Sequence, residues 1–431
     1  MNIALLVFML CFLLIFLIRI PIAPGMLMAS FFYFALAPGL SADISMAASQ
    51  FLSNMNSKFV LIAVPLFVFM AEVMNSGKIT DMIFRFANVI VGRKRGALGH
   101  VNVVASIIFS GMTGSALADA SGLGMMEIKA MNDHGYERGF SSAITAASAT
   151  IGPIFPPSIP MIFYSMLSGA SIGALFIGGM VPGIFIGLAL MGYIAVVARI
   201  RNYPRGEKLI LRDAMAITVK ALPALLSIVV LLGGIYSGIV TPTEAGALAA
   251  LYAIFVSFFV YRAMGFKDLL KVIMNTVKTT GTLSLLVGTA YAFSYIVAIE
   301  HIPDEVAGWL LTITNNKYVL LLLINIVFIV LGMFIDTMCI TLVFIPIVLP
   351  LVNTLGIDLV HFGVMITLNM MIGLSTPPFG MLLFVVSGIS KTPLIEVIKE
   401  ILPMLLVLFG VLFMVTFIPQ IVTFLPNLMG M

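Results

Sequence analysis

The sequence predicts an all-α polytopic membrane protein made of two inverted repeats, each with a re-entrant helical hairpin and a broken helix. Of its 431 residues, 61% are hydrophobic and 9% are charged, whereas soluble domains carry about a quarter charged residues. Its apolar runs approach or exceed about 18 residues, the length typical of membrane-spanning helices. A glycine followed closely by two prolines occurs twice inside such runs, at 152–157 and 373–378.

The apolar runs predict the elements in chain order. Two runs are unusual, because 101–124 is dense in Gly and Ser, and 318–350 carries Asp336 in its middle and prolines near its end. We expect both to be re-entrant hairpins that enter and leave the membrane on one side. Charges among apolar residues at near-helical spacing favour surface helices at the headgroup level, at 79–91 and 266–279. The remaining runs predict spans near 3–18, 25–38, 59–75, 140–165, 174–198, 222–238, 244–261, 281–298, 363–386 and 394–425.

The spans 140–165 and 363–386 should be broken helices. Proline removes a backbone donor and clashes with the preceding turn, so a Gly and a Pro-Pro pair interrupt the helix. In hydrocarbon the freed backbone groups cost several kcal/mol each, and such breaks persist only where protein or a wet cavity satisfies them. Two breaks in corresponding places indicate a transporter site near the middle of the membrane.

The breaks belong to a repeat that extends along the chain. Gly152 and Gly373 lie 221 residues apart (373 − 152), and the same offset relates Pro156 to Pro377 and Gly25 to Gly246. We therefore expect a first repeat over 1–205, a cytoplasmic linker over 206–221, and a second repeat over 222–431.

The distribution of Lys and Arg predicts the orientation, because cytoplasmic loops are enriched in these residues. With the hairpins above and both termini outside, 20 of the 22 basic residues fall on the inside, and only Lys58 and Lys317 fall outside. The first repeat then starts outside and the second starts inside, which makes the repeats inverted.

The hairpins and breaks hold the residues that could bind a ligand. Unwound carbonyls and Ser or Thr hydroxyls can coordinate Na⁺, helix N-termini favour anions, and ionisable groups at membrane depth are usually functional. We expect two cation sites flanking one anionic substrate. The candidate cation ligands are Ser110, Gly111, Thr113, Gly114, Ser115, Gly152, Phe155, Gly332, Asp336, Thr337, Gly373 and Thr376. The candidate substrate contacts are Ser115, Asp119, Ser121, Pro156, Pro157, Asn369, Ser375 and Pro377.

Other residue patterns favour no second function. The four His have no metal-ligand spacing, both Cys lie in apolar runs, and the basic residues sit in short loops rather than in a nucleic-acid-binding patch. The motifs G-x-x-x-x-G-K-[ST], H-E-x-x-H and G-x-S-x-G are absent, so an ATPase, protease or hydrolase is not expected. Glu72 and Glu244 are interpreted as groups that reach the interface from span ends, and Trp309 as an interfacial anchor.

Four stretches resemble the large membrane subunit, of the DctM type, of tripartite ATP-independent periplasmic (TRAP) transporters. They are GSALADASGLGMMEIKAM (114–131), IGPIFPPSIPMIFY (151–164), SGIVTPTEAGALAALYA (237–253) and LNMMIGLSTPPFGMLLFVV (368–386). The resemblance covers nearly the whole chain. It implies an elevator-type, Na⁺-coupled importer in a bacterial inner membrane. The first Na⁺ site would use 110–115 with Gly152 and its neighbours, and the second would use 332–337 with Gly373 and Thr376.

The resemblance also implies partners and a substrate class. The partners would be a periplasmic substrate-binding protein of the DctP type and a small DctQ-type membrane subunit, here a separate chain because no extra N-terminal spans are seen. The substrate would be a C4-dicarboxylate, sialic acid or another sugar acid, with the wording of 116–131 favouring the sugar acids. Alternatives are a self-sufficient Na⁺/organic-anion symporter and, more remotely, an ion channel; a membrane enzyme is least expected.

Overall fold

The structure is a computed structural model that describes residues 3–431 except 19, 37–43, 58, 207–209 and 315. Apart from one bridge pair between Arg95 and Arg205, the described secondary structure is helical throughout. The helices before residue 205 are α1 (Ile3–Ile18), α2 (Ile22–Leu36), α3 (Ile44–Ser57), η1 (Phe59–Ile62), α4 (Ala63–Ser76), α5 (Ile79–Val91), α6 (Ala97–Thr113), α7 (Ala116–Asp133), α8 (Arg138–Ala149), α9 (Ile159–Ser168) and α10 (Ile172–Ile200). Those after it are α11 (Leu211–Tyr236), α12 (Pro242–Phe255), η2 (Val256–Val260), α13 (Phe266–Ile299), α14 (Ile302–Ile313), α15 (Lys317–Phe334), α16 (Thr337–Thr354), α17 (Leu359–Leu374), α18 (Met381–Ser390), α19 (Leu394–Phe417) and α20 (Gln420–Leu428).

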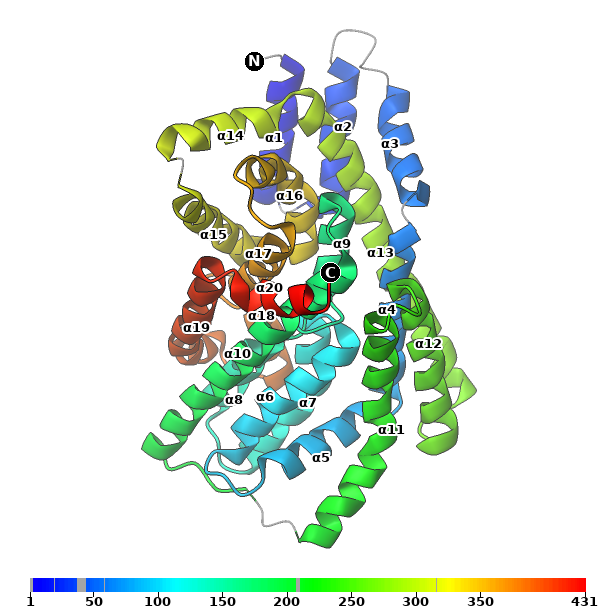
Figure 1. The fold of residues 1–431 in the computed structure, drawn as a ribbon, viewed down its shortest axis with the longest axis vertical. Helices are drawn as coiled ribbons and strands as arrows, with labels where there is room; N and C mark the ends of the chain where they lie inside the picture. Colours follow the sequence, from blue (N-terminus) through cyan, green and yellow to red (C-terminus); the bar gives the residue numbers. More distant parts are fainter. Residues whose placement is uncertain (1–2, 19, 37–43, 58, 207–209, 315) are drawn as a thin grey trace.

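The two predicted hairpins are helix pairs joined by two-residue turns. The first is α6 and α7, which cover 97–133 rather than 101–124, and the second is α15 and α16, which cover 317–354 rather than 318–350. Adding 221 to the bounds of α7 gives 337–354, the bounds of α16. The two broken helices follow at the same offset, as α8 with α9 and α17 with α18. In Figure 1 the first hairpin lies in the lower half of the molecule and the second in the upper half, so their tips approach the middle from opposite ends.

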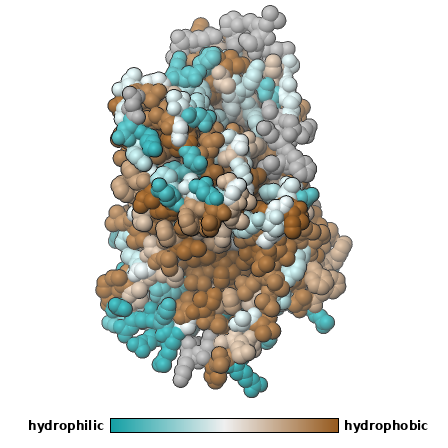
Figure 2. Space-filling model, viewed as in Figure 1, coloured by the Kyte–Doolittle hydropathy of each residue, from teal (hydrophilic) through white to brown (hydrophobic). Residues whose placement is uncertain are grey.

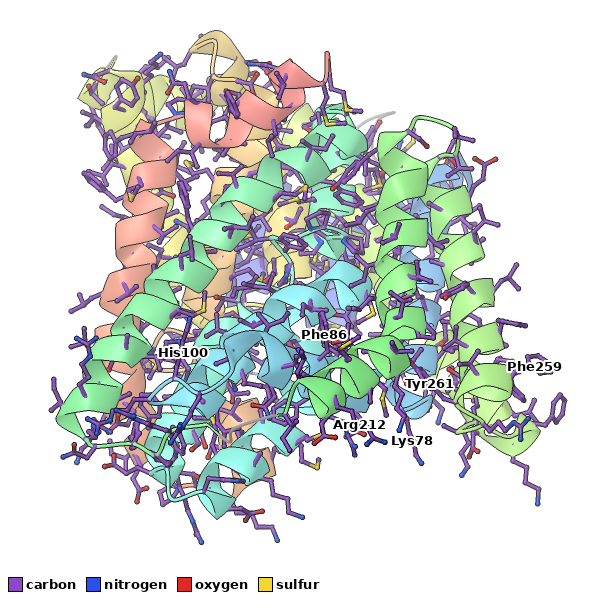
Figure 3. All side chains as sticks on the ribbon, turned by 60° about the horizontal axis from the view of Figure 1, so that its bottom comes forward. Lys78, Phe86, His100, Arg212, Phe259 and Tyr261 are labelled. Atoms are coloured by element: carbon purple, nitrogen blue, oxygen red, sulfur yellow. The ribbon has the colours of Figure 1, made fainter. Side chains whose placement is uncertain are left out.

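The described helices include seven that are long and apolar enough to cross a membrane, together with shorter apolar helices that include α4, α6, α9, α17 and α18. Figure 2 shows a broad hydrophobic band across the face of the molecule, with hydrophilic residues gathered toward its two ends. Figure 3 brings forward the end that carries the basic residues Lys78 and Arg212, and in this view Phe259 points away from the protein with 68% of its surface exposed.

The helices form two groups that position the site. In one group α13 packs on α2, α3 and α4, while α12 packs on α4 and α11. In the other group the hairpins and broken helices interlock, since α7 packs on both α8 and α18, and α16 packs on α9. The groups meet where α4 contacts α6 and where α13 contacts α16. The hairpin of one half is therefore held by the broken helices of both halves.

Three predicted boundaries were wrong. The surface helix 266–279 and the span 281–298 form one continuous helix, α13, because no proline separates them and a single glycine costs a helix only about 1 kcal/mol. Most of the linker 206–221 belongs to α11, which begins at Leu211. The span 394–425 ends at Phe417, and α20 starts after Pro419, whose missing N–H interrupts the helix.

The surface helix 79–91 is confirmed as a separate helix, α5, with the bounds predicted. Helices α3 and α14 were not predicted. Trp309 lies on α14 with 66% of its surface exposed. Residues 37–38 of a predicted span, Lys58, and 207–209 of the predicted linker lie outside the described residues.

Candidate functional site

The tip of the first hairpin is in backbone contact with the first break. The chain turns at Gly114 with φ of +59°, a left-handed conformation that favours glycine. A Cβ there would also lie 2.5 Å from the carbonyl oxygen of Pro157, which leaves no room for a side chain. The Ile159 amide donates to the Gly114 carbonyl at 3.4 Å. A Cβ on Gly152 would lie 3.3 Å from the carbonyl carbon of Ser115. These contacts bring the predicted tip and break residues together.

The second tip and the second break meet even more closely. A Cβ on Gly373 would lie 2.8 Å from the α-carbon of Gly332, so this approach is possible only between two glycines. Asp336 caps the N-terminus of α16, and its Oδ2 accepts from the Met338 amide at 2.9 Å. The neighbouring Thr337 is buried, and its hydroxyl has no hydrogen-bond partner among the described residues. An unpartnered oxygen beside a carboxylate is a suitable cation ligand.

The two tips open onto one cavity of about 290 Å³. Its walls come from α4, from both hairpin tips, from the first break and the start of α9, and from α13 and α17. The lining residues include two carboxylates, Glu72 and Asp336, and no Lys, Arg or His within the described chain. They are Val68, Ala71, Glu72, Asn75, Thr113, Gly114, Ser115, Ala116, Leu117, Ala118, Pro153, Ile159, Pro160, Thr279, Leu283, Asp336, Thr337, Met338, Met371 and Leu374.

Helix N-termini are the positive groups that the cavity offers. Helix α7 begins after Ser115, and α9 begins after Ser158, whose side-chain oxygen accepts from the Met161 amide. Both termini line the cavity, and each carries roughly half a positive elementary charge. The third terminus, of α16, is capped by the Asp336 carboxylate, whereas Asp119 in the first turn of α7 does not line the cavity. The cavity can therefore receive a carboxylate at the first tip without a cationic side chain.

The donors around the tips suit a hard monovalent cation better than a transition metal. No group of three or more His, Cys, Asp or Glu that could hold a metal occurs within the described ranges. The available ligands are carbonyl and hydroxyl oxygens with one carboxylate, which is the chemistry that unwound transporter helices use for Na⁺.

Several predicted site residues lie away from the cavity. Ser121 is exposed and donates to the Leu117 carbonyl of its own helix at 2.7 Å. Asp119 is buried inside the hairpin group, with both carboxylate oxygens unpartnered. Asn369 is buried and donates to the carbonyl and side-chain oxygens of Asn325 at 2.8 and 2.7 Å. Ser375 donates to the Ala146 carbonyl at 3.4 Å, which joins the second break to α8.

The remaining predicted residues lie at the tips and breaks but differ in what their side chains contact. The α-carbon of Gly111 lies against Ile228 of α11, and the Phe155 ring packs toward Gly183 of α10, so neither is directed at the opposite tip. The Ser110 hydroxyl donates to the Ser106 carbonyl of its own helix, and the Thr376 hydroxyl donates to the Ile372 carbonyl at the end of α17. Pro156 and Pro157 are buried, while Pro377 is half-buried. The peptide bonds Pro156-Pro157 and Pro377-Pro378 are both cis.

The sequence did not point to Glu72, Asn75, Thr279 and Leu283 as cavity residues. Glu72 was interpreted as a group reaching the interface; it lies in the second half of α4 and lines the cavity. An ionisable residue within an apolar helix is the signal that could have identified it. Glu244, interpreted in the same way, caps α12, where its Oε2 accepts from the Thr241 amide at 2.7 Å.

A buried polar network lies deeper in the first hairpin. The amide nitrogen of Asn102 donates to Glu127 Oε2 and to Thr145 Oγ1, both at 2.7 Å, and Ser148 donates to Asn102 Oδ1 at 2.6 Å. All four side chains are at most 1% exposed. The network ties α6, α7 and α8 together behind the tip.

The family model described as "Tripartite ATP-independent periplasmic transporter, DctM component" matches residues 9–421. The sialic acid TRAP transporter large permease protein SiaM of Vibrio cholerae is 42% identical over 90% of this chain and 91% of its own length. The C4-dicarboxylate TRAP transporter large permease protein DctM of Pseudomonas aeruginosa is 38% identical over 86% and 87%.

Two further proteins extend the comparison. The 2,3-diketo-L-gulonate TRAP transporter large permease protein YiaN of Escherichia coli is 35% identical over 88% of this chain and 89% of its own. The solved structure of the Alcanivorax borkumensis YdaH transporter superposes with a TM-score of 0.64 at 14% identity, covering 91% of this chain and 96% of its own. That likeness concerns the fold.

Proposed function

Since the chain belongs to the DctM family of tripartite ATP-independent periplasmic transporters, we propose that it is the large transmembrane subunit of a Na⁺-coupled importer of small organic acids. It would lie in the bacterial inner membrane with both termini on the periplasmic side. A periplasmic binding protein of the DctP type would deliver the substrate, and a separate small membrane subunit of the DctQ type would pack beside the chain.

The observation that carries this proposal is the cavity shared by the two hairpin tips. It joins elements of both halves, it offers the N-termini of α7 and α9 to an anion, and its lining holds no Lys, Arg or His within the described chain. An organic acid in such a cavity needs positive charge from elsewhere. Coupling cations bound at the two tip-and-break contacts would supply that charge, so substrate and cations would bind together.

The packing supports an elevator-type movement. The hairpins and broken helices contact one another on many sides; α4, α11 and α13 touch them directly at α6, α9 and α16, and α5 and α14 contact both groups. At that boundary Gly122 of α7 lies against the Asn75 side chain of α4, where a Cβ would be 2.9 Å from Asn75 Oδ1. A contact without a side chain on the α7 side would let the hairpin group slide past α4 as one body and carry the cavity's contents across the membrane.

The test is uptake of labelled sialic acid or succinate into proteoliposomes that hold this chain and its small partner. We expect uptake to need both an inward Na⁺ gradient and the cognate binding protein. Uptake with Na⁺ alone would show that the chain acts without a binding protein, and uptake independent of Na⁺ would contradict the coupling.

A further inference from the structure

We infer that Glu72, on the α4 side of the cavity, makes this transporter select hydroxylated monocarboxylic acids and exclude dicarboxylic acids. The inference rests on the proposed function and deepens it by naming the substrate class and a residue that sets it. Glu72 lies in the second half of α4, between Ala71 and Asn75 on the cavity wall.

The first step is the charge of the cavity. Two carboxylates line it, Glu72 and Asp336, and no Lys, Arg or His of the described chain joins them. Asp336 lies at the N-terminus of α16 and beside the second tip-and-break contact, where a coupling cation would offset it. Glu72 has no ion pair among the described residues. Because no described side chain offsets the negative charge of Glu72, that charge acts on a substrate in the cavity.

The second step is what the cavity offers to an anion. The N-termini of α7 and α9 adjoin each other, since the Ile159 amide donates to the Gly114 carbonyl at the tip. Together they can receive one carboxylate. A second carboxylate on the same small molecule would find no further helix N-terminus and no Lys, Arg or His of the described chain, and it would share the cavity with Glu72. Like charges at such short range repel each other at the effective dielectric of a partly wet site.

The third step is the kind of substrate group that Glu72 can bind. A carboxylate accepts hydrogen bonds from hydroxyl groups, and the adjacent Asn75 provides an amide in a fixed orientation. The Thr80 hydroxyl donates to Asn75 Oδ1 at 3.1 Å, and Gly122 packs against the amide group of Asn75. Asn75 lines the cavity beside Glu72, and Thr279 lines it from α13. These groups match the polyhydroxylated part of a sugar acid.

The experiment is equilibrium binding of labelled sialic acid to the full-length chain in lipid nanodiscs with Na⁺, with unlabelled gluconate and succinate as competitors. We compare the unchanged protein with Glu72→Gln, which removes the charge, and with Glu72→Asp, which keeps it. The matched control is Glu305→Gln, an exposed glutamate on α14. Gel filtration and thermal unfolding establish that each variant is folded.

We expect succinate to compete at least about tenfold more weakly than gluconate with the unchanged protein and with Glu72→Asp. In Glu72→Gln, competition by succinate should become at least about tenfold stronger relative to competition by gluconate. Glu305→Gln should leave competition by both acids unchanged. Equal competition by the two acids with the unchanged protein would overturn the inference. An equal effect of Glu72→Gln on both acids would also overturn it. An effect of Glu72→Gln on the Na⁺ titration alone would overturn it too, because Glu72 would then be a cation ligand. If no carboxylate binds in Na⁺, the proposed function fails, and this inference with it.

Discussion

Asn102 is the only described donor to the buried Glu127 carboxylate, so Asn102→Leu tests how the first hairpin is held together. The substitution removes three hydrogen bonds of 2.6 to 2.7 Å, to Glu127, to Thr145 and from Ser148. Glu127 Oε1 has no partner already, so the whole carboxylate would be left without a described donor.

The magnitude follows from these three contacts. Each of the three hydrogen bonds contributes roughly 0.5–1.5 kcal/mol, and leaving a buried acceptor unsatisfied costs roughly 1–3 kcal/mol more. Because the groups are fully buried, water screens none of them. The expected loss of unfolding free energy is therefore about 4 kcal/mol. Scaled to a chain of this length, this corresponds to a fall of roughly 4–8 °C in the unfolding temperature.

The assay is thermal unfolding in detergent, followed by far-ultraviolet circular dichroism. The exposed Asn353→Leu, near the end of α16, is the matched control and should leave the unfolding temperature unchanged. The double variant Asn102→Leu/Glu127→Leu removes both partners and should recover most of the loss, because no buried carboxylate is left unpaired. A single variant as stable as the unchanged protein, or a double variant as unstable as the single, would refute the reasoning.

Two further predictions concern the second hairpin. Gly373→Ala places a Cβ 2.8 Å from the α-carbon of Gly332, so we expect the free energy of unfolding to fall by about 1–3 kcal/mol and substrate uptake to be lost. The control Gly410→Ala places its Cβ in open space and should unfold and transport like the unchanged protein. Normal stability and uptake of Gly373→Ala would show that the two backbones can separate freely. Asp336→Asn keeps the α16 cap, since Asn caps helices equally well, but removes the charge. Its uptake should need at least about tenfold more Na⁺, a change of about 1.4 kcal/mol, whereas the exposed Asp213→Asn should not; an unchanged Na⁺ titration would remove Asp336 from the cation site.

The elements that were predicted are those whose cause is local. Each Pro-Pro break removes backbone donors wherever it stands, and the Gly-rich turn at the first tip needs a left-handed residue, so the hairpins and broken helices could be read from the sequence. Helix α14 was missed although α5, at 79–91, lies at the 221-residue offset from 300–312. Helix α3 relates in the same way to the first half of α13. The 221-residue repeat would therefore have indicated these relations if it had been applied to every element.

The site was predicted less completely, because contacts between the two helix groups produce no pattern in the local sequence. The tips and breaks came together as expected, through contacts between glycine backbones. Glu72 appeared to lie near a span end, and only the packing of α4 beside the tips places it at the cavity. Ser121 and Asp119 belong to the same helix but lie on faces that turn away from the cavity. The phase of a helix around its axis depends on its neighbours, which a single sequence does not supply.

The chain contains one tryptophan, Trp309, and its position on α14 has a practical consequence. Helix α14 packs against α16 of the second hairpin and against α13 of the other helix group. The intrinsic indole fluorescence of the unlabelled protein therefore comes from a single position beside the boundary between the two groups. Because the ring is largely exposed on the described chain, quenchers attached to lipid and quenchers dissolved in water would compete for it. The ratio of the two quenching effects, followed during Na⁺ addition, would report whether that boundary moves, without any label on the chain.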